Sequence, residues 1–456
     1  MRLGLKAWVI ALVAMSAGAR AETDLLDAAR SALAHDSAYA AAAAQQQADR
    51  TKRAQGRAGY LPQIFATGNV RYGSMDQETT GAHFSGGGFG ASDGIAFDTR
   101  AAGATGAGWA ITIKENLYSA AKHADAQQMS NAADAGDVSL KLARQTLLLQ
   151  VAQSYFAVLA AQDDVAALQS THDAALQARD IAQGRFDTGD ASITDVSDAQ
   201  SGADLAQAQW LAAQTTLDLK RAELQDLTGP SEAAIRPLPA SARVESLATG
   251  SFADWQSHAM LDNPLIALRR LGVDSARAET SRYRPGAGTT VDAFASYIGD
   301  RANGAGYGGN SSMRSNSAVV GITVTIPLYT GGLRHAKAQE SAALLKRADL
   351  DEDAARVSVA REVRQAFLGM QSAQIQVRAL TQALGSAQLQ LDANRTGFET
   401  GERPSIDVLN AQRVLFSTQR DLAAARYQVL FNRLRLAAAA GELDEDEIAR
   451  INALLH

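Results

Sequence analysis

The chain has 456 residues, no cysteine and a formal net charge of −6. The missing cysteines exclude disulfides, thiolate chemistry and an N-terminal lipidated cysteine, and an acidic chain without basic clusters is a poor nucleic-acid binder. Abundant alanine, only eight prolines and 20% charged residues are typical of long, closely packed helices.

The first 21 residues are predicted to be a secretory signal peptide. Basic residues come first, residues 7–17 are an apolar run of 11, and Ala19-Arg20-Ala21 fits a cleavage site. The alternative, a membrane-spanning helix, needs about 20 apolar residues. Cleavage would leave Glu22 first and, by removing three basic residues, change the formal charge from −6 to −9. No later run is long enough for a helical span, so we expect a periplasmic or secreted protein, or an outer-membrane β-barrel.

Residues 22–57 have helical spacing, and the pattern then changes to a period of two. Apolar and polar side chains alternate over residues 63–72 and again over residues 109–114. Between them, residues 73–108 are rich in Gly, Ser and Asp, which predicts a loop. The sequence therefore predicts a β-hairpin at about 61–118 with one apolar face.

The second half has the same order of patterns. Residues 264–284 are predicted to be helical, and residues 290–297 and 319–326 alternate as strands of a hairpin at about 287–328. The segment between them, 299–317, is again predicted to be a loop. Strands of about ten residues with one apolar face are the weak pattern of an outer-membrane barrel, and a soluble half-buried sheet is the alternative.

Each hairpin is followed by a Leu-Tyr pair and a helix of about 70 residues, which is about 100 Å long. Apolar residues in each long helix step by 4 and 3, which predicts coiled-coil packing. Every member of the second set lies 212 positions after its counterpart. The two sets are Leu147, Val151, Ser154, Val158, Ala161, Val165 and Leu168, and Val359, Val363, Ala366, Met370, Ala373, Val377 and Leu380.

Each long helix leads to a turn, and the two turns share a pattern. The first turn is residues 186–196 and the second turn is residues 398–408. Each has Phe two residues before Thr-Gly and Asp-Val six residues after that glycine, and the two glycines, Gly189 and Gly401, are 212 positions apart. Return helices to about residues 228 and 440 follow the turns. This in-register duplication predicts a repeat protein.

The predicted boundaries follow from this duplication. The first repeat is residues 22–229 and the second is residues 264–441, joined by a connecting segment at 230–263 beside the middle of the arms. Residues 442–456 form a C-terminal tail.

Several of these features together resemble the TolC family of outer-membrane channel proteins. They are the signal peptide, Tyr60-Leu61-Pro62 before a hairpin, Leu-Tyr before each long helix, the paired Phe-x-Thr-Gly turns and Ala425-Arg426-Tyr427. The resemblance covers essentially the whole chain after residue 21. It implies a mainly α fold with a β-barrel: a homotrimer whose subunits each give four strands to one twelve-stranded barrel in outer-membrane lipid, continued by a coiled-coil tunnel in the periplasm.

The resemblance also implies partners and a function. The partners would be a periplasmic adaptor and an inner-membrane transporter of the ABC or RND type, and the channel would serve type I protein secretion or efflux of small toxic compounds. The absent lipid-anchor cysteine and the match of both turns favour the secretion branch. A drug or heavy-metal efflux channel is one alternative, and a periplasmic or secreted coiled-coil structural protein is an alternative of another class.

The resemblance places a gate at the turns. Asp407 would form a three-fold acidic ring at the narrowest part of the tunnel, and this chain has Asn410 where the family has a second ring. Converging carboxylates attract cations and repel anions. The alternative for Asp407 is an ordinary carboxylate at a helix start, favoured by the helix dipole.

In the family, links between the two hairpins hold the gate closed. Arg403 would reach Thr194 in the same or a neighbouring subunit, and Asp195 would pair with a tyrosine at the position of Phe398. Because Phe398 has no hydroxyl, one link is lost and the gate is expected to open more easily. The tips Thr188, Gly189, Thr400 and Gly401 would carry the adaptor contact, although both glycines also suit a tight turn on backbone grounds alone.

Patterns that would indicate an enzyme or a cofactor are weak. The glycine clusters at 86–88 and 304–309 lack the Lys and Ser/Thr of a P-loop. The seven histidines are scattered, and no nucleophile–base arrangement stands out. The sequence therefore predicts neither catalysis nor a bound cofactor or metal.

Overall fold

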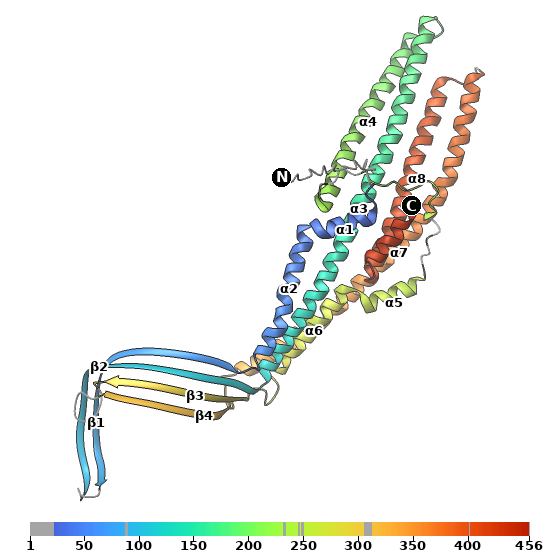
Figure 1. Ribbon diagram of the computed structural model, residues 1–456. Coiled ribbons are helices and arrows are strands. Elements are labelled where there is room, and N and C mark those ends of the chain that lie inside the picture. The colour runs from blue at the N-terminus through green and yellow to red at the C-terminus, as the bar shows by residue number, and fades with distance from the viewer. Residues whose placement is uncertain are drawn as a thin grey trace, which may run out of the picture. The chain divides into compact units, whose positions relative to one another are not determined.

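The computed structural model describes residues 22–86, 90–230, 234–244, 247, 250–304, 312–400 and 402–455. The predicted signal peptide and Gly401 lie outside the described residues. The residues that the structure describes are mainly helical, with one four-stranded sheet (Figure 1). The chain divides into two compact units, one formed by the chain up to Gln46 with Val138–Leu268 and the chain from Asp353, the other by Gln47–Asp137 with Arg269–Glu352.

The sheet is antiparallel and follows chain order. Its strands are β1 (Gln63–Gly86), β2 (Gly90–Ser119), β3 (Thr290–Asn303) and β4 (Ser312–Thr325), in the order β1-β2-β3-β4. β2 and β3 are therefore paired on both sides, while β1 and β4 are each paired on one side only among the described residues.

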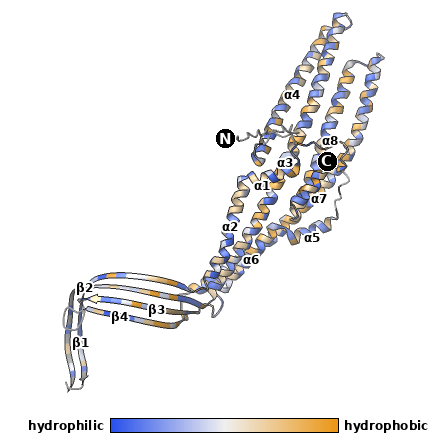
Figure 2. Cartoon of the chain, in the orientation of Figure 1, coloured by the Kyte–Doolittle hydropathy of each residue, from blue (hydrophilic) through white to orange (hydrophobic). Residues whose placement is uncertain are grey.

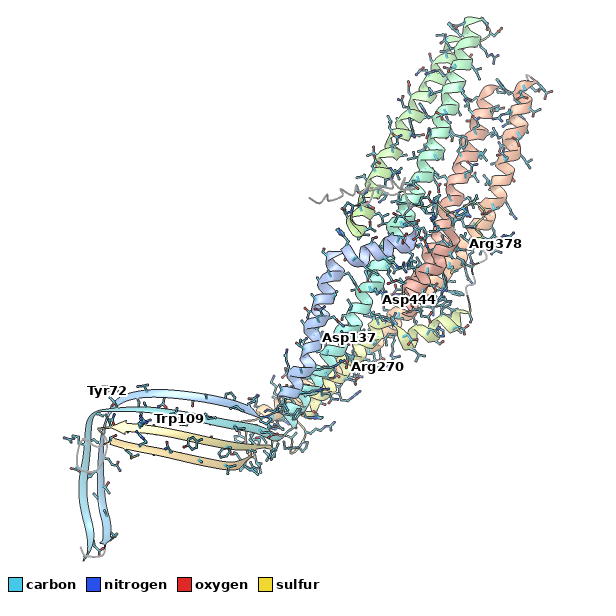
Figure 3. All side chains as sticks on the ribbon, viewed as in Figure 1. Tyr72, Trp109, Asp137, Arg270, Arg378 and Asp444 are labelled. Atoms are coloured by element: carbon cyan, nitrogen blue, oxygen red, sulfur yellow. The ribbon has the colours of Figure 1, made fainter. Side chains whose placement is uncertain are left out.

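The register places the apolar side chains on one face, as the alternation predicts. Ile64 pairs with Ile113, Ile113 with Ala295, and Ala295 with Val320, so this row crosses all four strands. Trp109, labelled on the sheet in Figure 3, has its ring centroid 5.5 Å from that of Tyr297 on the same face. The opposite face carries polar pairs such as Thr112 and Ser296, whose hydroxyl oxygens are 3.0 Å apart.

The prediction of a loop at residues 73–108 is wrong. β1 continues to Gly86 and β2 begins at Gly90, so the first hairpin extends beyond the part of the sheet that includes β3. Composition misled the prediction because a strand ladder needs only backbone groups, and glycine lowers strand propensity without forbidding a strand. Gly81, Gly94 and Gly103 have positive φ, and they lie at the register shifts of this hairpin. Glycine at such bulges lets the strands re-register.

The second predicted loop, 299–317, is also shorter than expected. β3 continues to Asn303 and β4 begins at Ser312. Residues 305–311, which include most of the second glycine cluster, lie outside the described residues.

The helix predicted over residues 22–57 is two helices. α1 (Leu25–His35) and α2 (Ser37–Ala58) are separated by Asp36, whose backbone is extended. The Asp36 carboxylate accepts a hydrogen bond from Tyr39 N at 2.6 Å, so a helix cap formed inside the pattern breaks it. The helix expected at 264–284 is α6 (Pro264–Ser281).

The two long helices have nearly equal lengths. α3 (Ala120–Asp187) has 68 residues and α7 (Leu333–Glu399) has 67. The return helices α4 (Ile193–Thr228) and α8 (Ser405–Ala440) have 36 residues each. α8 begins 212 positions after the start of α4 and ends 212 positions after its end. Among the described residues, no helix is both long enough and apolar enough to cross a membrane. Leu117 and Tyr118 lie within β2, whereas Leu328 and Tyr329 lie between β4 and α7.

The predicted coiled-coil stripe is largely buried. Leu147, Val151 and Val158 of α3 are buried, as are Val363 and Met370 of α7. The largest hydrophobic cluster lies where α3 and α8 meet α1 and the C-terminal helix α9 (Glu445–Asn452). A short helix, α5 (Phe252–Asp262), packs on α8, and a 3₁₀ turn (Ala453–Leu455) ends the described chain.

Hydrogen bonds join the start of α1 to the end of α9, and the segment that follows α4 to α3. The buried side chain of Asn452 accepts from Leu25 N at 3.0 Å and donates to Asp24 at 2.8 Å. Tyr155 donates to the carbonyl of Arg236 at 2.9 Å. Alternating apolar and polar positions along all these helices are visible in Figure 2.

Candidate functional site

The first turn is held by its own side chains and backbone. Gly189 has φ +84°, a left-handed conformation that favours glycine. Asp190 N donates to Arg185 O at 2.7 Å, and the Thr188 hydroxyl donates to Arg185 O at 3.0 Å and contacts the Asp190 carboxylate at 3.1 Å. These bonds satisfy carbonyl groups at the end of α3.

The start of α4 is a capping box. Ser192 Oγ accepts from Asp195 N at 3.2 Å, and the Asp195 carboxylate accepts from Ser192 N at 2.9 Å and from Ser192 Oγ at 2.9 Å. These hydrogen bonds to Ser192, the backbone one above all, hold the pKa of Asp195 below its usual range. The Asp195 carboxylate is therefore occupied within its own turn.

The second turn shares one backbone hydrogen bond with the first, from Glu402 N to Gly397 O, but its side chains have different partners. Glu402 N and Arg403 N donate to Gly397 O at 2.8 and 2.9 Å, and α8 begins after Pro404, which makes no side-chain cap. Arg403 Nη1 instead contacts the Asp407 carboxylate at 3.3 Å, and Asn394 donates to the Asp407 carbonyl at 3.2 Å. The Asp407 carboxylate therefore has a side-chain partner four residues before it, whereas the Asp195 carboxylate is bound to its N-cap residue.

The residues predicted to lock the gate are placed at the two turns. Within this single chain, Arg403 pairs with Asp407 rather than with Thr194, whose hydroxyl contacts that of Ser192. Phe398 is half-buried near the end of α7. A link from Arg403 to Thr194 of a neighbouring subunit stays a prediction.

The residues predicted to form the acidic ring and the adaptor contact lie at the two turns or in the first turns of α8. Asp407 is in the first turn of α8 and its side chain is 32% exposed, while Asn410 is exposed. Thr188 and Thr400 are exposed, and Thr400 caps α7 by donating to Gly397 O at 3.1 Å. Gly401 lies outside the described residues.

A groove of about 460 Å³ runs between the antiparallel helices α3 and α4 and the start of α8. It is lined by Ala175 and Ala178 of α3, Asp195 and Gly202 of α4, and Leu409 of α8. The groove brings the charged first turn of α4 and the first turns of α8 to a common surface.

Two polar contacts between α3 and α8 were not predicted from the sequence. Tyr427 of α8 donates to the Asp163 carboxylate of α3 at 2.6 Å, and Arg420 of α8 lies 3.5 Å from Asp164. Burial raises the pKa of Asp163 above its usual range, against the opposing effect of the Tyr427 hydrogen bond. Tyr427 belongs to one of the motifs that carry the resemblance, so a signal existed, but no spacing could identify Asp163 as its partner.

Among the described residues, no group of three or more His, Asp or Glu side chains could hold a metal ion. The candidate site consists of the two turns, the Arg403–Asp407 ion pair and the groove.

Comparisons with known proteins agree with this architecture. The family model described as "Outer membrane efflux protein" matches residues 28–230 and 255–442. The alkaline protease secretion protein AprF of Pseudomonas aeruginosa is 27% identical over 94% of this chain and 86% of that protein. The outer membrane protein TolC of Salmonella enteritidis is 30% identical over 76% of this chain and 71% of that protein.

A solved structure shares the fold. The outer membrane protein VceC of Vibrio cholerae superposes with a TM-score of 0.73 at 16% identity, covering 91% of this chain and 96% of that chain. The predicted resemblance to the TolC family is confirmed, and the chain belongs to the outer membrane efflux protein family.

Proposed function

We propose that this chain forms a homotrimeric exit duct across the outer membrane. The observation that carries the proposal is the open sheet, in which β1 and β4 each keep one unpaired edge among the described residues. Unpaired backbone groups are too costly in lipid, so a membrane sheet must close into a barrel. Three copies would close twelve strands by pairing β4 of one subunit with β1 of the next.

The two faces of the sheet fit the two sides of such a barrel. Val70 and Val320 on the apolar face are 88% and 83% exposed, which suits contact with lipid. Thr112 and Ser296 on the opposite face would line the lumen. In this proposal the exposed apolar face is the lipid-binding surface of the subunit.

The helical part would continue the barrel as a coiled-coil tunnel in the periplasm. Helices of 67 and 68 residues are about 100 Å long, far longer than a bilayer crossing. The two sequence repeats, residues 22–229 and 264–441, would supply equivalent hairpins to the tunnel. The tips Thr188, Gly189, Thr400 and Gly401 would contact a periplasmic adaptor that joins the duct to an inner-membrane transporter.

The exported class is proposed to be protein, through a type I system with an ABC transporter. The similarity to a relative named as a protease secretion protein over 94% of the chain supports this choice. Efflux of small compounds through an RND transporter is the second candidate. Cross-linking in cells followed by mass spectrometry distinguishes them, because an ABC transporter should be captured in the first case and an RND pump in the second.

The gate is proposed to lie at the second turn. Asp407 from three subunits would form one acidic ring, and Asn410 leaves the second ring position uncharged. Arg403 would also reach Thr194 of a neighbouring subunit and hold the gate closed, while Phe398 cannot offer the hydroxyl that Asp195 would need.

The test is biochemical. The protein should fractionate with the outer membrane, run as a heat-labile trimer after detergent extraction, form pores in planar bilayers and begin at Glu22 after export. Recovery as a soluble monomeric rod would instead support the coiled-coil structural protein.

A further inference from the structure

We propose that Pro404 and Gly397 position Arg403 on Asp407, so that Arg403 sets the charge that the constriction presents to permeating ions. The inference rests on the proposed acidic ring and adds its regulation.

Because Pro404 is the N-cap residue of α8, the Asp407 carboxylate is not bound in a capping box. Asp195 and Asp407 occupy the same position of their helices, 212 residues apart, and each lies three residues after the N-cap. In the first turn, Ser192 offers both an N–H and a hydroxyl to the Asp195 carboxylate. Proline has neither group, so Asp407 cannot form a capping box and its carboxylate is free to take another partner.

Gly397 makes room for that partner. A Cβ added at Gly397 would lie 2.7 Å from Arg403 Cγ and 3.3 Å from Arg403 Cβ. These atoms belong to the stem of the side chain, which cannot swing away as the guanidinium could. Arg403 N also donates to Gly397 O, which fixes the backbone of the arginine at this close approach. The residue of the first turn that corresponds to Gly397 is Arg185, which has a side chain. Of the two turns, the second is therefore the one with a glycine at this position.

The result is a close ion pair between residues i and i+4, which among the described residues of the two turns is found in the second turn. Arg403 Nη1 lies 3.3 Å from the Asp407 carboxylate, and the two side chains are 59% and 32% exposed. The residue that corresponds to Arg403 in the first turn is Ala191. A cation that approaches the proposed ring would therefore meet three carboxylates, each with an arginine charge beside it, and the arginine weakens the attraction.

The experiment measures this charge in planar bilayers. Reversal potentials in a KCl gradient and block by hexamminecobalt(III) are recorded for the full-length trimer at about 0.1 M salt, where charges within about 10 Å still act. Arg403→Gln should make the pore more cation-selective and tighten the block by about three- to tenfold. Arg395→Gln is the matched control, because it removes the same charge from an exposed position on α7, and it should change the block less than about twofold.

Two further variants test the positioning residues. Gly397→Ala should move the block in the same direction as Arg403→Gln, whereas Gly385→Ala on the same helix meets no atom within 4 Å and should have no effect. In a Pro404→Ser background, which restores a capping hydroxyl and an N–H, Arg403→Gln should change the block less than it does in the wild type.

The outcomes separate the inference from the function on which it rests. Pores whose block does not change with Arg403→Gln, or for which Gly397→Ala matches Gly385→Ala, overturn the inference. If Arg403→Gln changes the block in the Pro404→Ser background as much as it does in the wild type, Pro404 does not have the proposed role. If the wild-type protein forms no pore, or if Asp407→Asn leaves the block unchanged, the proposed channel or its ring is wrong.

Discussion

The first and second turns carry the same Asp-Val pair at the same distance from the same Thr-Gly, yet their aspartates have different partners. Asp195 is bound within a capping box to Ser192, and Asp407 faces Arg403. The difference comes from single positions, Ser192 against Pro404 and Ala191 against Arg403. The backbone hydrogen bond from Asp190 N to Arg185 O recurs as the bond from Glu402 N to Gly397 O, while substitutions beside it changed the partner of the carboxylate.

The comparison predicts that replacing Asp by Asn has different effects in the two turns. Asp407→Asn removes the proposed ring, so it should weaken hexamminecobalt(III) block by about tenfold or more. Asp195→Asn removes a cap and should leave the block within about twofold of the wild type. Single-channel recording in planar bilayers measures both, and equal effects of the two variants would show that the turns are equivalent.

The second largest effect is expected at Arg403, through the gate. Arg403→Ala removes the predicted link to Thr194 of a neighbouring subunit. A partly exposed polar link is worth about 1 kcal/mol, so the opening equilibrium should shift severalfold and single-channel conductance should rise. Arg395→Ala serves as the control. If the conductance of Arg403→Ala equals that of the wild type, Arg403 does not hold the gate closed.

The capping box should be measurable as local stability. Ser192→Ala removes the cap hydroxyl, and N-caps of this kind contribute about 1 kcal/mol. Hydrogen exchange in the first turns of α4 should therefore become faster. Pro404→Ala removes no side-chain cap, so the first turns of α8 should lose less protection. A larger loss in α8 would contradict the assignment of the cap to the first turn.

The smallest expected effect is a pH dependence of the local stability at the first turn. Because the folded-state pKa of Asp195 is lowered, its ionised form is the one that stabilises the fold. This stabilisation is complete above the usual Asp pKa of about 4 and is lost as the pH falls through the lower folded value. Protection factors in the first turns of α4, which are exchange rates corrected for the intrinsic effect of pH, should fall over that range in the wild type, and Asp195→Asn should remove this part of the pH dependence.

Much of the architecture could be predicted because it repeats. Periods of two and of 3.5 in side-chain polarity gave the strand faces and the long buried stripes, and the 212-residue offset located both turns. Such patterns are local, and each is supported by many residues, so a few exceptions do not change the prediction.

The remaining features depend on backbone geometry or on single contacts. The first hairpin is longer than predicted because its glycines serve bulges inside a ladder, whereas composition alone suggests a loop. The break at Asp36 depends on one cap. The pairing of Arg403 with Asp407 depends on the space at Gly397 and on the missing N–H of Pro404, which no periodicity reveals.

The most direct test of the account asks which turn meets its copies on the trimer axis. The chain contains no cysteine, so Asp407→Cys and Asp195→Cys each introduce one thiol per subunit. After treatment of the assembled trimer with a short bismaleimide, denaturing gels should show linked subunits for Asp407→Cys and monomers for Asp195→Cys. Linked subunits for Asp195→Cys, with Asp407→Cys remaining monomeric, would contradict the placement of the acidic ring at the second turn.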